Sequence, residues 1–432
     1  MQILENLRRQ LDGELQTDEL HRHLYATDAS IYRELPLAVA YPKHKADIKT
    51  LVAFAREQGL SLIPRSAGTS LAGQCVGSGI VVDISRHMTK VLEINAQERW
   101  VRLQPGVIRD ELNLLLKPHG LFFGPNTSTA NRCMLGGMVG NNSCGTTSIV
   151  YGTTRDHVMA LDVVLSDGAE ARFSALTKTE FEQKKSGAGL EGALYRQLFD
   201  ALNAPETQAE IRREFPKPGI HRRNTGYAVD LLLNSNVFSP GGPDFNFCQM
   251  LTGSEGTLAF TTEITLHVDP LPDPFDVVVC PHFDNMPQCL EAVVAAMQHQ
   301  PDACELMDKL ILDCTKANRE QSKNRFFVEG DPAAVLMIEF REKSREEAEQ
   351  KAAAMIADLK NRGFGYAFPV IPGPKSRQVW DLRAAGLGVL SNMPGEAKGV
   401  ACIEDTAVEV TDLPAYIAEF EEMMAGFGQK SV

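Results

Sequence analysis

Apolar residues in the first half of the chain fall into short runs separated by Gly, Pro and polar turns. Ile48, Leu51, Val52 and Ala55 recur at helical spacing, which predicts an amphipathic helix over residues 42–59. Strands are expected at residues 60–63, 79–84, 91–94, 100–103, 159–165 and 169–173, a helix at 107–118, and a polar surface excursion at 174–192. This mixture predicts an α+β fold rather than a regular βαβ repeat.

Three prolines in the segment 269–274 separate this pattern from a second one. Because proline fixes φ and lacks a backbone donor, neither a strand nor a helix is expected to continue through the segment. Beyond it, strands are expected at 277–279, 334–340 and 401–410, and helices at 287–300, 304–314, 344–362 and 412–425. We therefore predict a helical N-terminal extension over residues 1–35, an α+β domain over 36–270 and an α/β sandwich over 271–432.

The composition narrows the possible functions mainly by exclusion. The 432 residues are 44% hydrophobic with a net charge of −13, which argues against nucleic acid as the main partner. No apolar run approaches the ~20 residues that a membrane span needs, and the first residues lack the pattern of a signal peptide. The nine cysteines form no C-x-x-C pair, which indicates reduced thiols and a cytoplasmic location. It also argues against an iron–sulfur cluster or zinc ribbon held by this chain alone.

The first candidate site is the segment 64–74, Pro-Arg-Ser-Ala-Gly-Thr-Ser-Leu-Ala-Gly-Gln, which follows a predicted strand. Its small residues leave the backbone N–H groups uncovered, so these can approach a phosphate closely. Gly68 and Gly73 have the spacing of a nucleotide-triphosphate loop, but Gln74 and Cys75 stand where that loop needs Lys and Ser or Thr. The segment therefore suits an anion that is bound but not transferred, such as a pyrophosphate, with a plain turn as the alternative.

Further stretches of the same character occur at residues 123–129, 135–145 and 253–258. The stretch 135–145 predicts a short helix of small residues whose open N-terminus offers N–H donors. Any one of these stretches predicts only a turn. Their occurrence together, in this order, predicts a site for phosphate groups.

The matching motifs are PRSAGTSLAGQ (64–74), GPNTSTANRCMLGGMVGNNSCG (124–145), YGTTRDHV (151–158), RRNTGYAVDLL (222–232) and GSEGTLAFTTEITL (253–266). As a set they resemble the FAD-binding domain of the vanillyl-alcohol oxidase / p-cresol methylhydroxylase type, in the branch called FAD-linked oxidases. Within that family the chain is most similar to the group of D-lactate dehydrogenase, the glycolate oxidase flavin subunit and D-2-hydroxyglutarate dehydrogenase. Family-like signals run from about residue 36 to the last predicted helix.

The resemblance implies a two-lobed p-cresol methylhydroxylase-type FAD-binding domain, with the lobe boundary near residue 100, followed by the α/β sandwich as a cap domain. The residues expected to hold FAD are Pro64, Arg65, Ser66, Ala67, Gly68, Thr69, Ser70, Pro125, Thr127, Gly136, Gly137, Asn141, Asn142, Ser143, Gly145, Glu255, Gly256 and Thr257. Relatives with covalent FAD often carry a His in the first loop, and residues 66–70 contain none. We therefore expect non-covalent FAD, with Cys75 and Cys144 as alternative attachment points on chemistry alone.

The second part resembles the cap of the same family through Trp-Asp-Leu-Arg at 380–383 and Ile-Glu-Asp-Thr-Ala-Val-Glu-Val at 403–410. Arg383 is expected to bind the substrate carboxylate, because its planar fork matches a carboxylate, and Lys398 is expected to assist. Relatives carry two later motifs whose histidines bind a divalent metal or take the hydroxyl proton, and none of the ten histidines here matches them. The catalytic base, the metal ligands and any iron–sulfur domain are therefore expected beyond Val432, and no metal site is expected in this chain.

The resemblance implies an FAD-dependent dehydrogenase that oxidises a small D-2-hydroxy acid such as D-lactate, glycolate or D-2-hydroxyglutarate. The C2 hydride would go to flavin N5, and the electrons to an iron–sulfur or quinone-linked acceptor. Peripheral association with the inner membrane stays open beside the cytoplasmic location. One alternative is a non-catalytic FAD-binding subunit of such a complex. Another is a different flavoenzyme on the same scaffold, a UDP-sugar reductase or an alkyl-glycerone-phosphate-type transferase.

Overall fold

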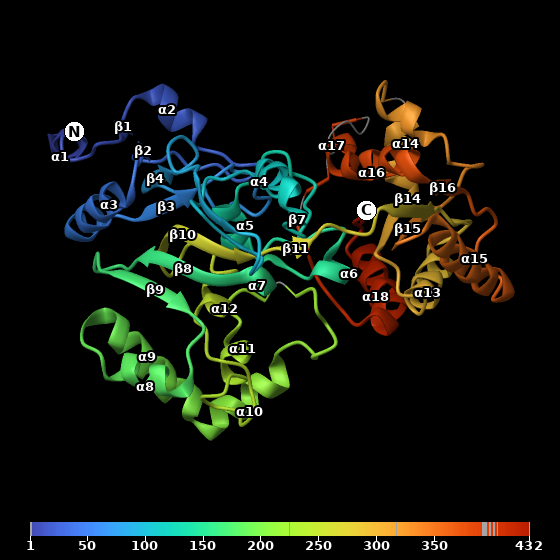
Figure 1. The fold of residues 1–432 in the computed structure, drawn as a ribbon. Helices are drawn as coiled ribbons and strands as arrows, with labels where there is room; N and C mark the ends of the chain where they lie inside the picture. The colour runs from blue at the N-terminus through green and yellow to red at the C-terminus, as the bar shows by residue number, and fades with distance from the viewer. Residues whose placement is uncertain are drawn as a thin grey trace.

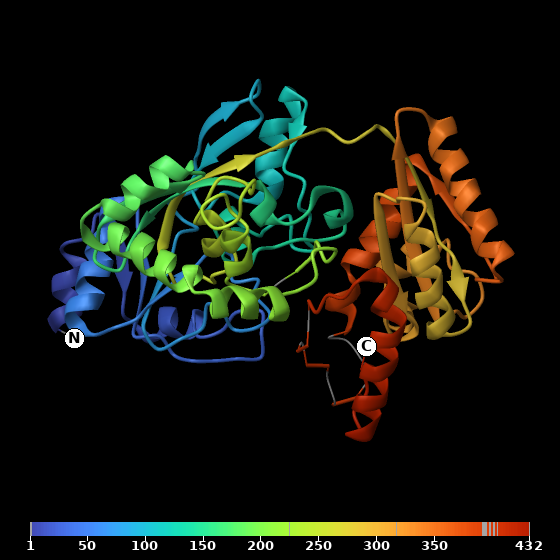
Figure 2. The ribbon, with the colours of Figure 1, turned by 90° about the horizontal axis from the view of Figure 1, so that it is seen from below.

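The computed structural model describes residues 2–223, 225–316, 318–390, 395–396, 399–400, 402–403 and 405–431. The chain forms two bodies that lie beside each other (Figure 1), with the N-terminus on the first and the C-terminus on the second. Seen from below, an extended segment that starts near β11 (Asp269–Pro270) crosses from one body to the other (Figure 2). The crossing falls in the proline-rich segment.

A four-stranded sheet with the order β1-β2-β4-β3 forms one side of the first body. Its strands are β1 (Glu14–Gln16), β2 (Ala38–Tyr41), β3 (Leu62–Arg65) and β4 (Ile80–Asp83), and the nearby helices are α1 (Gln2–Arg8), α2 (Glu19–Leu24) and α3 (Lys45–Gln58). The central strands β2 and β4 are buried along their whole length, as a strand covered on both faces requires. The helical extension expected over residues 1–35 contains α1 and α2 but also the strand β1, which pairs antiparallel with β2.

A five-stranded antiparallel sheet with the order β5-β6-β10-β8-β9 forms the rest of the first body. Its strands are β5 (Val91–Asn95), β6 (Trp100–Leu103), β8 (Val158–Val164), β9 (Glu170–Ser174) and β10 (Phe260–His267). Helices α8 (Lys178–Ser186), α9 (Gly189–Asn203) and α10 (Pro205–Glu214) lie below β9 in Figure 1. The polar excursion expected at 174–192 is thus largely helical: a capping box at Thr177 starts α8, whose only buried residue is Phe181.

The second body is a five-stranded sheet in which β15 pairs with β12, β13 and β14, and β16 pairs with β12. Its strands are β12 (Phe275–Val279), β13 (His282–Phe283), β14 (Ala303–Asp308), β15 (Ala334–Glu342) and β16 (Val370–Pro372). Helices α13 (Met286–Met297) and α15 (Arg345–Asn361) bury one face of the sheet, and α14 (Lys309–Lys316) and α16 (Ser376–Ala384) bury the other. The sheet between two helical layers confirms the α/β sandwich.

Two expectations for the second body are wrong. The helix expected at 304–314 begins only at Lys309, because β14 occupies Ala303–Asp308 and runs into α14 without a Gly or Pro between them. The strand expected at 401–410 is absent from residues 402–403 and 405–409, and Val410 starts the 3₁₀ turn η4.

Apart from the long C-terminal helix α18 (Leu413–Gly426), the remaining elements are short and lie mostly in the connections. They are η1 (Lys117–His119), β7 (Leu121–Phe122), α4 (Arg109–Leu116), α5 (Leu135–Asn141), α6 (Ser148–Tyr151), α7 (Thr154–His157), α11 (Val229–Leu233), α12 (Cys248–Leu251), η2 (Gln321–Arg325), η3 (Gly373–Lys375), α17 (Gly386–Leu390), η4 (Val410–Asp412) and α18 (Leu413–Gly426). Within the described part of the chain, no helix is both long and apolar enough to cross a membrane.

Candidate functional site

The glycines of α5 allow the first predicted loop to approach this helix closely. A Cβ at Gly137 would lie 2.4 Å from Ser66 Oγ, and one at Gly136 would lie 2.6 Å from Pro105 Cβ. Both distances are shorter than real Cβ contacts, so any side chain there would displace a neighbour. At Gly140 the nearest foreign atom, Glu255 Cα, is 3.8 Å away, which is ordinary contact. The helix is therefore packed closely against the loop at Gly137 and against Pro105 at Gly136, but not at Gly140.

The loop 253–258 joins the same cluster through main-chain hydrogen bonds. The Gly253 and Glu255 amides donate to the carbonyls of Val139 and Gly140, both at 2.9 Å. Gly253 has a positive φ of +88°, in the left-handed region that glycine tolerates and most other residues avoid. The loop therefore continues the hydrogen-bonding of α5 where the helix ends.

Side chains complete the contact between these segments. A Cβ at Gly256 would lie 3.0 Å from Pro64 Cγ, so the loop 253–258 contacts the start of the loop 64–74. The Gln74 amide nitrogen donates to Asn141 Oδ1 at 3.4 Å and to Glu255 Oε1 at 3.5 Å. The structure thus brings residues 64–74, 135–145 and 253–258 together, and we name them the three-loop cluster.

Two features of the three-loop cluster fit a pyrophosphate. The Ser70 hydroxyl is buried and has no hydrogen-bond partner among the residues that the structure describes, so a ligand oxygen would satisfy it. The Arg65 guanidinium donates to the Thr27 carbonyl at 2.8 Å and lies over the Tyr25 ring, with its carbon 5.0 Å from the ring centroid. A Cβ at Gly68 would lie 2.5 Å from that guanidinium, so a fixed positive charge underlies the turn. A buried donor and a nearby cation are what an FAD pyrophosphate would need.

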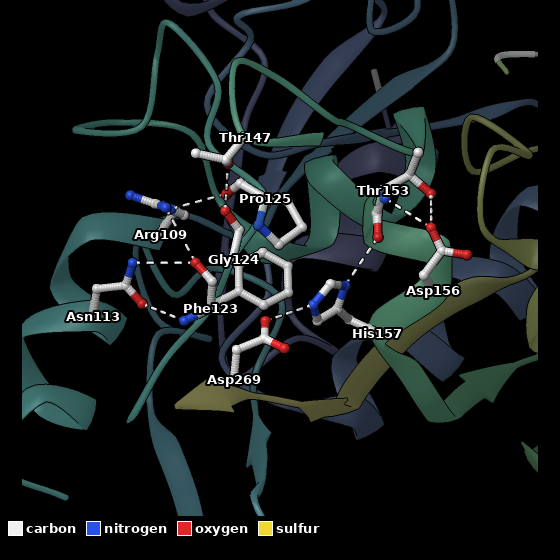
Figure 3. Close-up of polar contacts among 10 residues, drawn as sticks. All are labelled: Arg109, Asn113, Phe123, Gly124, Pro125, Thr147, Thr153, Asp156, His157 and Asp269. Atoms are coloured by element: carbon white, nitrogen blue, oxygen red, sulfur yellow. Dashed lines mark hydrogen bonds and ion pairs between the residues drawn. The ribbon is translucent and has the colours of Figure 1, made fainter. Parts of the chain in front are cut away.

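Another loop, residues 123–127, is held by two side chains of α4, the buried Arg109 and the half-buried Asn113 (Figure 3). Arg109 donates from Nε to the Pro125 carbonyl at 3.0 Å and from Nη2 to the Phe123 carbonyl at 3.1 Å. Asn113 accepts from the Phe123 amide at 2.7 Å. The carbonyls of this loop are therefore fixed by side chains of the protein itself.

The same loop packs tightly on the turn that follows α5. A Cβ at Gly145 would lie 1.7 Å from the Asn126 carbonyl oxygen, a backbone atom that cannot rotate away. The Thr147 hydroxyl donates to the Gly124 carbonyl at 2.9 Å (Figure 3). The hydroxyl of Thr127 contacts Cys133 Sγ at 3.3 Å. The contact of Gly145 with the Asn126 carbonyl explains why position 145 requires a glycine. The Thr127 hydroxyl already has a partner within the chain, and its contact with FAD stays a prediction.

Asn142, Ser143 and Thr257 also have partners inside the protein. Asn142 is buried with a φ of +53°, and its Oδ1 accepts from the Arg155 amide at 2.9 Å. Ser143 Oγ accepts from Asn141 at 3.1 Å, and the Thr257 hydroxyl shares a hydrogen bond of 2.5 Å with Tyr227. Asn142 thus shapes the turn from inside, and its direct contact with FAD stays a prediction.

His157 lies next to this region, and its importance could not be read from the sequence. It is buried, with Nδ1 3.0 Å from the Thr153 carbonyl and Nε2 2.9 Å from Asp269 Oδ2 (Figure 3). A carbonyl and a carboxylate are both acceptors, so these contacts favour the protonated ring, in which both nitrogens donate. Burial lowers the pKa of His157, but the bonds to Asp269 and Thr153 outweigh burial and raise it overall. The pair ties α7 to the start of the crossing segment.

Burial also shifts two groups in the three-loop cluster. It raises the pKa of Glu255 to about 7, so this carboxyl is partly neutral near physiological pH. It raises the pKa of Cys75 to about 11, so the sulfur stays a thiol at neutral pH. An inert thiol is a poor nucleophile, which supports the expectation that Cys75 does not attach FAD.

The proposed substrate arginine lies in the second body, in the last turn of α16. Arg383 donates from Nε and Nη2 to one oxygen of Glu305 on β14, at 2.9 and 2.6 Å. This pair fixes one edge of the guanidinium and leaves its charge partly compensated. Lys398 lies outside the described residues, as does Glu404 of the family-like segment.

A second arginine, Arg222, was not predicted as a site residue from the sequence, although it lies in the family-like motif at 222–232. Its Nε donates to Cys144 Sγ at 3.0 Å, and its Nη2 pairs with Asp405 Oδ1 at 3.1 Å. Cys144 belongs to the turn after α5, and Asp405 belongs to the second body. The only signal in the sequence was the motif around residues 222–232, which gave no partner for this side chain.

Comparison with known proteins gives the family. Residues 36–174 match the FAD binding domain model, and residues 272–431 match the model for FAD linked oxidases, C-terminal domain. The chain is 35% identical over 440 residues to D-2-hydroxyglutarate dehydrogenase of Pseudomonas putida. The aligned region covers 99% of this chain and 42% of that protein. It is 24% identical over 429 residues to the mitochondrial D-lactate dehydrogenase (cytochrome) of Arabidopsis thaliana, covering 96% of this chain and 62% of that protein.

Among solved structures, alkyldihydroxyacetonephosphate synthase aligns with a TM-score of 0.61 at 16% identity, over 90% of this chain and 64% of that one. A likeness at this identity shows the fold alone. The chain spans 42% of the length of the D-2-hydroxyglutarate dehydrogenase it matches. The two family models nevertheless cover both bodies, and the expected cofactor, FAD, is confirmed. The chain therefore belongs to the FAD-linked oxidases, in the group that includes D-lactate dehydrogenase, glycolate oxidase subunits and D-2-hydroxyglutarate dehydrogenase.

Proposed function

We propose that this chain is the FAD-binding and substrate-facing part of a dehydrogenase that oxidises a D-2-hydroxy acid, with D-2-hydroxyglutarate as the first candidate. The observation that carries this proposal is the 35% identity to D-2-hydroxyglutarate dehydrogenase over 99% of the chain, through both bodies. Bound FAD would supply a hydride acceptor at flavin N5. The iron–sulfur or quinone-linked acceptor and a cytoplasmic location belong to the same proposal.

The chain's own residues would hold the cofactor and orient the substrate. Ser70, the backbone of residues 65–70 and the Arg65 charge would hold the pyrophosphate without a covalent bond. Arg383 would bind the substrate carboxylate with the donors that do not face Glu305. Because Glu305 fixes the guanidinium before substrate arrives, little side-chain entropy is lost on binding.

The test is anaerobic reduction of the flavin in the purified full-length protein. D-2-hydroxyglutarate should bleach the visible flavin absorption, whereas its L-enantiomer should not. D-lactate, glycolate and NADPH serve as comparators, and bleaching by NADPH alone would favour a reductase on the same scaffold. A flavin that no hydroxy acid reduces would favour the non-catalytic subunit.

The role of Arg383 is tested in the same assay. Arg383→Met should weaken substrate binding by roughly 10- to 100-fold, since a charge-assisted hydrogen bond contributes about 1.5–3 kcal/mol. Arg383→Lys should recover only part of the affinity because a lysine lacks the planar fork. The nearby Arg377 on the same helix serves as the matched control, and Arg377→Met should bind substrate normally.

Non-covalent binding has its own test. Acid precipitation of the protein should leave the yellow colour in the supernatant. Colour retained in the pellet would contradict the proposal and point to Cys144 as the attachment point, since burial makes the thiol of Cys75 unreactive.

A further inference from the structure

Arg222 lies where the two bodies meet. It belongs to the connection between α10 and α11 in the first body, and this connection passes close to the segment that leads into α18 of the second body. A Cβ at Gly219 would lie 3.0 Å from Glu409 Oε1, and Lys217 pairs with Asp412 at 3.1 Å. Charged side chains of residues 217–222 therefore face acidic side chains of residues 405–412 across the junction.

Arg222 differs from Lys217 in what else it touches. Its Nε donates to Cys144 Sγ at 3.0 Å while its Nη2 pairs with Asp405 at 3.1 Å. Cys144 immediately precedes Gly145, which packs on the Asn126 carbonyl. One guanidinium thus bonds both to the turn that closes the three-loop cluster and to the second body.

Arg222 is joined to the same body that carries the proposed substrate arginine. Desolvation lowers the pKa of Arg222, but the bond to Cys144 and the charges of Asp405 and Glu305 outweigh it and raise the pKa overall. Asp405, the ion-pair partner of Arg222, and Glu305, the carboxylate that holds Arg383, both belong to the second body.

We propose that Arg222 is a positioning residue that holds the FAD-binding turn at Cys144 against the second body, which carries the substrate arginine Arg383. This rests on the proposed function, because Arg383 matters only if the second body binds a carboxylate substrate over the flavin. The planar fork lets Nε and Nη2 reach two partners at fixed spacing, whereas a lysine has one nitrogen for both. Removing the fork should let the turn and the second body move independently.

The experiment uses the full-length protein with FAD bound and three variants. Arg222→Met removes the charge while keeping much of the side-chain volume, and Arg222→Lys keeps the charge but not the fork. Lys217→Met is the matched control because it removes an ion pair across the same junction without a bond to Cys144. Hydrogen exchange of residues 141–145 and 405–412 is measured together with kcat and KM for D-2-hydroxyglutarate.

Arg222→Met should speed exchange at both 141–145 and 405–409, and should lower kcat about tenfold while KM changes less than about threefold. Arg222→Lys should show exchange rates and a kcat between those of Arg222→Met and of the wild type. Lys217→Met should speed exchange only at 405–412 and keep kcat.

Unchanged exchange at 141–145 in Arg222→Met, or equal loosening there by Lys217→Met, would overturn the proposal. If no hydroxy acid reduces the wild-type flavin, the proposed function fails, and the exchange comparison still decides whether Arg222 links the two bodies.

Discussion

Gly137 offers the sharpest test of how the three-loop cluster is built. An alanine Cβ there would lie 2.4 Å from Ser66 Oγ, about 1 Å short of ordinary contact. Ser66 has only a short side chain, so the strain must be taken by an off-rotamer χ1 or by movement of the loop. An off-rotamer side chain costs about 0.5–1.5 kcal/mol. Because the loop is the proposed pyrophosphate site, we expect Gly137→Ala to weaken FAD binding by roughly three- to tenfold.

Two companion variants isolate this cause. Gly140→Ala lies on the same helix with nearest foreign atoms at 3.8 Å or more, so it should keep the cluster and stabilise α5 by up to ~1 kcal/mol. In a Ser66→Ala background the clashing oxygen is gone and the next atom, Ser66 Cβ, is 3.6 Å away. Gly137→Ala should therefore cost little FAD affinity in that background.

The assay is titration of the apoprotein with FAD, followed by quenching of flavin fluorescence, beside chemical denaturation of each variant. A double-mutant cycle over Ser66 and Gly137 should give a coupling of about 1 kcal/mol. If Gly137→Ala bound FAD as tightly as the wild type, or if its defect persisted in full without the Ser66 hydroxyl, the steric account would be refuted.

Three other predictions follow from the same region. Because burial raises the pKa of Glu255 from 4.5 to about 7, the wild type should lose stability as pH rises through that window. Glu255→Gln should lack this loss in urea unfolding between pH 5 and 8, and its FAD affinity should vary less with pH. His157 has a raised pKa, so its bond to Asp269 stabilises fully below the ordinary value of 6.5 and is lost as pH rises through the folded-state pKa. Asp269→Asn should therefore differ from the wild type in unfolding free energy at pH 6 more than at pH 9, and an equal difference at both would contradict the assignment. Gly145→Ala places Cβ 1.7 Å from the Asn126 carbonyl oxygen, so it should destabilise the fold by at least ~1–3 kcal/mol, and unchanged thermal unfolding would show that the turn relaxes freely.

Local sequence patterns predict much of the fold and of the cofactor site. The apolar run at 79–84 predicts a strand, and the structure places β4 there, buried along its whole length. The small residues of 64–74 and 135–145 predict close backbone approach, and the 2.4 Å limit at Gly137 shows the reason. The FAD cofactor and the α+β fold class are confirmed by the family models and the architecture.

The failures have equally physical causes. A strand that runs straight into a helix, as β14 does into α14, has no breaker residue to mark the change of period. An alternating segment such as 402–410 needs a partner edge to become a strand, and its described residues have none. The bond between His157 and Asp269 joins positions 112 residues apart, and a distance of that kind is set only by the tertiary fold.

The hydrogen bonds that hold the loop 123–127 affect how fast FAD can bind. Fixing one backbone residue costs about 1–2 kcal/mol of conformational entropy, and a flexible loop would lose this entropy when FAD binds. Here Arg109 donates to the carbonyls of Phe123 and Pro125, and Asn113 accepts from the Phe123 amide, so the loop is ordered once the protein has folded. FAD would then meet a surface already in shape, and its uptake would proceed at an encounter-limited rate of roughly 10⁵–10⁷ M⁻¹s⁻¹ rather than at the rate of a folding step.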